Sequence, residues 1–254
     1  MLELDDIWKS YRGLPAVRAL SLRAKPGQVV GLLGRNGSGK TTTVRMIVGL
    51  ARPTRGVIRW RGVDIRQQLL AYQSLVGYVP EEPRLYAYLT APEYLELVGG
   101  LRGIPRATLI RRTNRYLELF GLDTDRYAPL SSFSKGMRQK VLIAAALLHD
   151  PTIVVFDEPN SGLDIGASLI LRTLVNTLAQ RGKIVIYSSH LLDVVERVCQ
   201  EVLILHDSAV VASNSVTRLR ELTHSASLEE AFAAVSIDQD VDRIGREIAD
   251  VATL

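Results

Sequence analysis

Gly34-Arg35-Asn36-Gly37-Ser38-Gly39-Lys40-Thr41-Thr42 follows the apolar run Val29 to Leu33 and leads into a run of residues with helical periodicity. Three of its first six residues are glycines. Without a Cβ atom, a glycine lets the backbone N–H groups approach phosphate oxygens closely. We expect Lys40 to reach the β- and γ-phosphates and the Thr41 hydroxyl to bind Mg²⁺. The stretch predicts a phosphate-binding loop at a helix N-terminus, where the helix dipole favours an anion.

The residues after the loop support this interpretation. Val44, Ile47, Val48 and Leu50 recur at helical spacing, which predicts a helix from Thr41 onward. The alternative is a glycine-rich turn beside a surface lysine. The order of strand, loop and helix disfavours that alternative, because it is the context that a phosphate-binding loop requires. The predicted nucleotide-binding residues of the loop are Gly34, Asn36, Gly37, Ser38, Gly39, Lys40, Thr41 and Thr42.

A second apolar segment, residues 152–156, ends in the carboxylates Asp157 and Glu158. A central strand of a parallel sheet is expected to deliver such acids to the phosphate end of the sheet. Asp157 suits the Mg²⁺ shell, directly or through water. Glu158 faces another direction and is placed to polarise the attacking water as a general base. The alternative is a strand end with solvated acids, which the neighbouring phosphate-binding loop disfavours.

Residues 130–140 read Leu-Ser-Ser-Phe-Ser-Lys-Gly-Met-Arg-Gln-Lys. These residues resemble the signature segment of the ATP-binding cassette family, whose form is Leu-Ser-Gly-Gly-Gln. The loop and the acidic strand resemble other segments of the same family. Ser134 and Gly136 are retained, whereas Lys135 and Met137 replace the first glycine and the glutamine. The resemblance implies that Ser134 and Gly136 bind the γ-phosphate of ATP held by a second copy in a head-to-tail dimer, with Lys135 adding positive charge. A plain helix N-cap is the alternative role of Ser134.

The resemblance extends to three further features in family order. Residues 160–164 resemble the loop that crosses the dimer interface, although a polar turn before a helix is the simpler role for its serine and glycine. His190 resembles the histidine that contacts the γ-phosphate and holds the Glu158 side chain and water in place. Tyr11 resembles the aromatic residue that stacks on adenine; the alternative is a tyrosine at the surface or the edge of the core.

Glu81 occupies a position that carries glutamine in the family. It lies in Gly77-Tyr78-Val79-Pro80-Glu81-Glu82-Pro83, which resembles the segment that joins Mg²⁺, the attacking water and the membrane partner. A carboxylate can still bind a hard cation, but it brings a charge and lacks the amide donor. We therefore predict that Glu81 contributes to the metal site and tunes Mg²⁺ affinity and coupling, while Glu158 is the base.

Composition limits the remaining possibilities. The chain has 254 residues and one cysteine, so an internal disulfide is excluded. Cys199 shares a helical spacing with Leu192 and Val195, which predicts core packing. No secretory signal is expected, and no segment reaches the roughly 20 apolar residues of a membrane span. The net charge of +4 comes from scattered arginines, and Arg111-Arg112 has no aromatic stacking platform beside it, so no nucleic-acid partner is expected.

The sequence predicts an α/β fold with a P-loop NTPase core, a mixed or parallel sheet with flanking helices, an antiparallel β subdomain and a helical signature subdomain. We expect a single cassette domain over residues 1–254, with the core and antiparallel part in 1–89 and 150–225, the helical subdomain in 90–149 and a helical extension in 226–254. Expected strands are 16–23, 56–60, 152–156 and 183–187. One expected helix starts at Pro92 and another covers residues 167–179. A further helix is expected to have an inner face formed by Leu109, Ile110, Thr113, Tyr116, Leu117 and Phe120.

The C-terminal part carries two weaker signals. Residues 227–232 resemble the ending of cassette subunits that serve export-type permeases. Val241, Ile244, Ile248 and Val251 recur at spacings of three and four, which predicts a short amphipathic helix. That helix either packs on its own domain or contacts a second copy or an accessory partner.

The resemblance implies a cytoplasmic ATPase subunit, peripheral to the membrane, that binds ATP and Mg²⁺ and pairs with a second cassette subunit. Its partners would be separate integral-membrane permease subunits, with export favoured over import. One alternative is a soluble cassette ATPase acting on the ribosome or nucleic acid. Another is a weakly catalytic regulatory subunit, since the signature and glutamine positions are altered. The first alternative usually has two cassettes or a long coiled coil, and Lys40, Asp157, Glu158 and His190 argue against the second.

Overall fold

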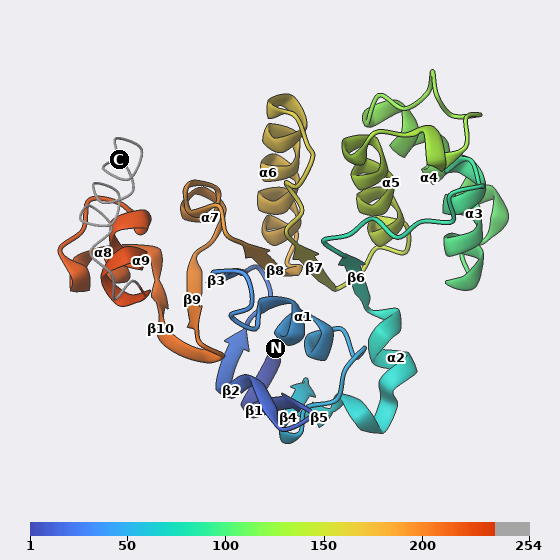
Figure 1. The fold of residues 1–254 in the computed structure, drawn as a ribbon. Coiled ribbons are helices and arrows are strands. Elements are labelled where there is room, and N and C mark those ends of the chain that lie inside the picture. Colours follow the sequence, from blue (N-terminus) through green and yellow to red (C-terminus); the bar gives the residue numbers. More distant parts are fainter. Residues whose placement is uncertain (237–254) are drawn as a thin grey trace, which may run out of the picture.

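A computed structural model describes residues 1–236 and contains a ten-stranded mixed sheet flanked by helices (Figure 1). The strand order across the sheet is β5-β4-β1-β2-β10-β9-β3-β8-β7-β6. The strands are β1 (Leu2–Tyr11), β2 (Leu14–Ala24), β3 (Val29–Gly34), β4 (Arg55–Trp60), β5 (Val63–Asp64), β6 (Val76–Val79), β7 (Ile153–Asp157), β8 (Ile184–Ser189), β9 (Glu201–His206) and β10 (Ala209–Ser215).

One half of the sheet is parallel. β3 pairs in parallel with β8 and β9, β8 with β7, and β7 with β6. Alternate residues of these strands enter two apolar cores, one on each face of the sheet, because successive side chains of a strand point to opposite faces. In β7, Ile153 and Val155 enter one core, and Val154 and Phe156 the other. The predicted α/β fold with parallel strands and crossover helices is confirmed.

The other half is antiparallel and joins the parallel half through a narrow seam. β1 pairs with β2 and β4 in antiparallel fashion, and β4 pairs with β5. The seam is the parallel pairing of Ala209 in β10 with Arg18 in β2. The turn between β9 and β10 reinforces it: the Arg18 guanidinium donates to the Asp207 carbonyl at 2.5 Å, and the Ser208 hydroxyl donates to the Pro15 carbonyl at 3.0 Å.

The α-helices lie on both sides of the sheet. They are α1 (Lys40–Ile47), α2 (Leu69–Ser74), α3 (Ala91–Leu101), α4 (Arg106–Leu119), α5 (Lys135–Leu147), α6 (Ile165–Gln180), α7 (Leu192–Val198), α8 (Val216–Thr223) and α9 (Leu228–Ser236). Helix α1 ends earlier than the periodicity suggested. Gly49 has φ +75°, which ends the helical path, and the predicted inner residue Leu50 is 64 % exposed.

Helices α3, α4 and α5 form a group of their own beside the β6 end of the sheet (Figure 1). Thr90 and Glu93 start α3 with a capping box, in which each side chain binds the other residue's backbone N–H. The predicted inner face of α4 is buried at Leu109, Thr113 and Leu117, and Tyr116 and Phe120 are half-buried. Ile110 is exposed, so its assignment to this face was wrong.

The C-terminal helices α8 and α9 pack on α7 and β10. Cys199 is buried in the same core, as predicted. None of the helices within residues 1–236 is both long and apolar enough to cross a bilayer. The amphipathic stripe predicted for residues 241–251 lies outside the described residues.

His149 links the end of the helical group to the sheet. Its Nε2 atom is 3.1 Å from the Val76 carbonyl of β6, so Nε2 carries the proton and donates. Burial, together with the charges of Arg102 and Arg112, lowers the pKa of His149 to about 4, although the Val76 hydrogen bond and Asp150 oppose the shift. The folded state therefore keeps His149 neutral at pH values at which the unfolded chain, with a pKa of about 6.5, binds a proton.

His149 should accordingly make folding stability fall as the pH falls from 6.5 towards 4. Replacing it with glutamine keeps a donor for the Val76 carbonyl and removes the titration. The unfolding temperature of His149→Gln should therefore drop less between pH 7 and pH 4.5 than that of the wild type. Thermal denaturation across this range tests the prediction, with the exposed His224→Asn as control; parallel curves for His149→Gln and the wild type would contradict it.

Candidate active site

Three adjacent parallel strands bring the predicted site residues to one edge of the sheet. β3 lies beside β8 with Leu33 opposite Ser189, and β8 lies beside β7 with Ser188 opposite Asp157. The phosphate-binding loop, the acidic pair and His190 all follow the carboxyl ends of these strands. In open α/β sheets this edge is the usual ligand-binding edge.

The phosphate-binding loop connects β3 to α1 and is closed from above by β2. Gly39 has φ +107°, which favours glycine. A Cβ atom at Gly39 would lie 2.4 Å from the Ala16 carbonyl oxygen, so no larger residue fits without moving β2. The loop is therefore shaped partly by a strand of the antiparallel half.

Lys40 is buried at the start of α1, with 6 % of its surface exposed. Its ammonium donates to the Gly34 carbonyl at 2.6 Å and to the Arg35 carbonyl at 3.3 Å. It also lies 3.6 Å from the Oε1 atom of Glu158. Lys40 thus joins the phosphate-binding loop to the predicted general base.

A cavity of about 330 Å³ lies over this loop. It has the predicted phosphate ligands on one side and carboxylates on another, so the two predicted sets of residues meet at one place. The lining residues are Ala16, Asn36, Gly37, Gly39, Lys40, Thr41, Thr42, Glu81 and Glu158.

Asp157 lies beneath the cavity at the end of β7 and is fully buried. Burial, together with the Glu81 and Glu158 charges, raises the pKa of Asp157 to about 6, although the Ser188 and Thr41 hydroxyls oppose the shift. Within residues 1–236, neither carboxylate oxygen of Asp157 has a hydrogen-bond partner of good geometry. A buried carboxylate without a well-formed hydrogen bond, beside a threonine hydroxyl, is a set of oxygen donors suited to Mg²⁺. The residues present therefore fit the ion expected with ATP.

Glu158 is held between two basic groups. Its Oε2 atom lies 2.8 Å from Nδ1 of His190 and accepts from the His190 backbone N–H at 3.3 Å. Its own backbone N–H donates to the Ser188 carbonyl at 2.9 Å. Glu158 is 7 % exposed and has φ +48°, an uncommon conformation for a side chain of this size. This geometry fixes the carboxylate above the phosphate-binding loop, where it could accept a proton from water.

Seven predicted site residues are not part of this cavity lining. Gly34 and Ser38 belong to the loop itself, and Asp157 and His190 adjoin its carboxylates, whereas the other three lie in separate elements. Tyr11 ends β1 and is 46 % exposed, and the Lys9 ammonium lies 5.0 Å from the centre of its ring. Ser134 is the N-cap of α5, and its hydroxyl accepts from the Met137 N–H at 3.2 Å. Gly136 follows in the first turn of the same helix. The roles predicted for Tyr11, Ser134 and Gly136 in nucleotide binding remain predictions.

Two residues of the site were not singled out from the sequence. Ser188 lies opposite Asp157 in the sheet, and with Ser189 it gives an otherwise apolar strand a polar end, which was a usable signal. Ala16 closes the phosphate-binding loop through its carbonyl group, and no side-chain pattern could have revealed that contact.

Comparison with known proteins gives the family of this chain. The family model described as "ABC transporter" matches residues 17–161. The ABC transporter ATP-binding protein NatA of Bacillus subtilis (strain 168) is 39 % identical over 237 residues, which cover 91 % of this chain and 96 % of NatA. The bacitracin transport ATP-binding protein BcrA of Enterococcus faecalis is 33 % identical and covers 87 % of this chain and 71 % of its own length.

Solved structures show the same fold. An ATP-binding subunit of an ABC transporter superposes with a TM-score of 0.86 and 33 % identity, covering 92 % of this chain and 99 % of the other. The dimeric post-hydrolysis state of the ATP-binding cassette MJ0796, bound to ADP and Pi, superposes with a TM-score of 0.77 and 25 % identity, covering 85 % and 98 %.

The fold and the site define an ATP-hydrolysing P-loop cassette. The chain belongs to the ABC transporter family, as an ATP-binding subunit.

The burial of Asp157 should cost stability when no metal is bound. Because its folded pKa is raised above the unfolded value of 3.8, the charged carboxylate destabilises the fold above pH 6, and the penalty fades as the pH falls towards 4. At pH 8 in metal-free buffer, Asp157→Asn should therefore be more stable than the wild type by about 1–3 kcal/mol of unfolding free energy. Its unfolding temperature should be correspondingly higher. The gain should shrink at pH 4.5. Equal unfolding temperatures at pH 8 would contradict the prediction.

Proposed function

We propose that this chain is the ATPase subunit of an export-type transporter and works at the cytoplasmic face of the membrane. It would bind separate membrane-spanning subunits and act as a head-to-tail dimer that closes on ATP. The observation that carries the proposal is the position of Glu158, fixed between Lys40 and His190 at the phosphate-binding cavity. This arrangement supports a site in which a base, a phosphate ligand and an orienting histidine surround one point.

Each residue has a distinct task in this proposal. The loop N–H groups and Lys40 bind the phosphates. Thr41 and Asp157 would hold Mg²⁺, with Glu81 near them, and the ion would neutralise charge on the phosphate oxygens. Glu158 accepts the proton of the attacking water, and His190 keeps the Glu158 carboxylate in place.

A second copy would complete the site. Ser134 and Gly136 lie outside the cavity lining of their own chain, whereas the N-terminus of α5 has the geometry of an anion site. The dimeric form of a solved cassette at 25 % identity supports a paired arrangement. Since ATP binds the closed dimer better than the open one, its binding energy shifts that equilibrium by the difference.

Export rests on the relatives. Two have printed names that describe transport out of the cell or of an antibiotic: Nod factor export ATP-binding protein I of Ralstonia nicotianae, 33 % identical over 88 % of this chain, and the bacitracin protein described above. The word export in the first name supports an exporter for this chain, together with the sequence resemblance of residues 227–232, whereas the second name states transport without a direction.

Glu158→Gln tests the catalytic assignment. It keeps the shape and removes the base, so ATP hydrolysis should fall by at least about 100-fold while ATP binding persists. The variant should also form a dimer at saturating Mg-ATP, because closure no longer ends in hydrolysis. Phosphate release and light scattering after size exclusion measure these two properties.

Glu81→Gln is the matched control, since it makes the same change of chemical group at the second carboxylate that lines the cavity. It should retain hydrolysis and shift the Mg²⁺ concentration at half-maximal activity, because Glu81 is assigned to the metal site. An inactive Glu81→Gln beside an active Glu158→Gln would reverse the two roles. A Glu158→Gln protein that stays monomeric with Mg-ATP, even with its membrane partners, would overturn the proposed function.

A further inference from the structure

Lys135 connects the signature segment to the loop that carries Glu158. Its ammonium donates to the Ser161 hydroxyl at 2.5 Å within the same chain. Lys135 is the first residue of α5, directly after the N-cap Ser134, and Ser161 lies in the turn after β7. The Lys135 ammonium, predicted to add positive charge near ATP, therefore already has a hydrogen-bond partner within its own chain.

Packing around this hydrogen bond is close. Gly162 has φ +81°, and a Cβ atom there would lie 2.9–3.1 Å from the aliphatic carbons of Lys135. A Cβ atom at Gly136 would lie 2.5 Å from the Gly162 carbonyl oxygen. The stem of Lys135 thus covers Gly162 while its head reaches Ser161, and the first turn of α5 rests directly on the backbone of the loop.

The loop on the other side of this contact is tightly built. The Ser161 N–H donates to the Glu158 carbonyl at 3.1 Å, which closes a turn on the general base. The Asn160 amide donates to the Tyr187 hydroxyl at 2.7 Å, and Asp164 Oδ1 accepts from the Ala167 N–H at 2.8 Å to start α6. A displacement of Ser161 is therefore passed to the Glu158 backbone by a short, hydrogen-bonded turn.

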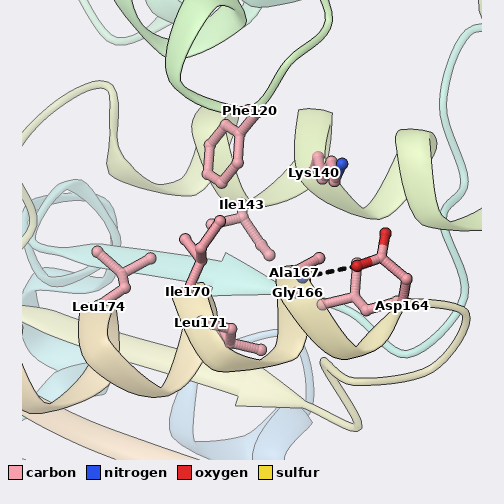
Figure 2. A pocket seen from close by; sticks show the side chains of 10 residues that line it. Phe120, Lys140, Ile143, Asp164, Gly166, Ala167, Ile170, Leu171 and Leu174 are labelled. Carbon is pink, nitrogen blue, oxygen red and sulfur yellow. Dashed lines mark hydrogen bonds between the residues drawn. The ribbon is translucent and has the colours of Figure 1, made fainter.

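Further along α5 from the Lys135 contact, a mainly apolar groove of about 220 Å³ lies between α5 and α6. Figure 2 shows Ile143 and Lys140 on one side of it and Ile170, Leu171 and Ala167 on the other, with Phe120 above. Close-packed interfaces move as units. This groove is open to solvent, with Ile170 54 % exposed, so few protein atoms couple its two walls. At the start of α5, the helical group touches the Glu158 loop through the Lys135–Ser161 contact and the Gly136–Gly162 contact.

We propose that Lys135 is a positioning residue for ATP hydrolysis. Through Ser161, it fixes the position of the loop that carries Glu158 relative to α5. The inference rests on the proposed function, in which the start of α5 binds ATP held by the second copy. Lys135 would then pass the presence of nucleotide in the neighbour's site to the base of its own site. This role differs from simple attraction of a triphosphate by a positive charge, and the two make opposite predictions.

Four variants separate the two roles. Lys135→Met keeps the stem over Gly162 and removes the donor, and Ser161→Ala removes the acceptor without changing any charge. The double variant closes a mutant cycle, and Lys25→Met removes one exposed lysine far from the site as control. Steady-state hydrolysis gives kcat, KM for ATP and the Hill coefficient for each protein, measured well below its unfolding temperature.

If Lys135 positions the loop, Lys135→Met and Ser161→Ala should each lower kcat by about tenfold, because small misplacements of a catalytic group are costly. KM should change by less than about twofold, the Hill coefficient should fall towards one, and the double variant should lose no more than either single variant. Lys25→Met should match the wild type. If Lys135 acts only by charge, Lys135→Met should raise KM, Ser161→Ala should match the wild type, and the inference is overturned.

A dimerisation assay keeps this inference separate from the proposed function. In a Glu158→Gln background, Lys135→Met should still form the Mg-ATP dimer, since Ser134 and Gly136 are intact. Dimer formation combined with unchanged kcat in Lys135→Met overturns only the role of Lys135. Failure of Glu158→Gln alone to dimerise overturns the proposed function and this inference with it.

Discussion

The site depends on the register of three parallel strands. Because β3, β8 and β7 are paired so that Leu32, Ser188 and Asp157 lie side by side, the loop, the histidine and the carboxylates emerge together. A slip of one residue in β7 would turn Asp157 to the opposite face of the sheet. The alternating burial of β7 in two apolar cores prevents that slip, since each face accepts only its own set of side chains.

The cavity concentrates negative charge. Glu81 and Glu158 line it and Asp157 lies beneath it, while Lys40 is the buried cation among the described residues of the lining. ATP adds further negative charge, and at low local dielectric such repulsion is large. A divalent cation bound there would do more than complete a coordination shell, because it would make the joint presence of nucleotide and carboxylates electrostatically tolerable. Burial and the charges of Glu81 and Glu158 also raise the pKa of Asp157, so the repulsion already acts in the protein without nucleotide.

Much of this architecture was predictable from local patterns. The phosphate-binding loop, the acidic strand end and the buried Cys199 each follow from a few consecutive residues whose chemistry admits few alternatives. Contacts between distant segments were not predictable: the Ala16 carbonyl over Gly39, and Lys135 against Ser161, depend on how separate elements meet. Leu50 and Ile110 were misplaced for a related reason, because periodicity marks an apolar stripe but does not show where a helix ends or which edge of the stripe stays open. The signature, histidine and adenine assignments came from resemblance, and their roles remain predictions.

The seam between β2 and β10 has a consequence for biosynthesis. The phosphate-binding loop is translated early, but both strands that border β3 and the turn that holds Arg18 in place belong to the last third of the described chain. A nascent chain on the ribosome therefore exposes the glycine-rich loop long before it can be shaped, and local contacts alone cannot complete it. Nucleotide can act as a folding ligand only once nearly the whole polypeptide has left the exit tunnel, so earlier truncation products gain no protection from cellular ATP.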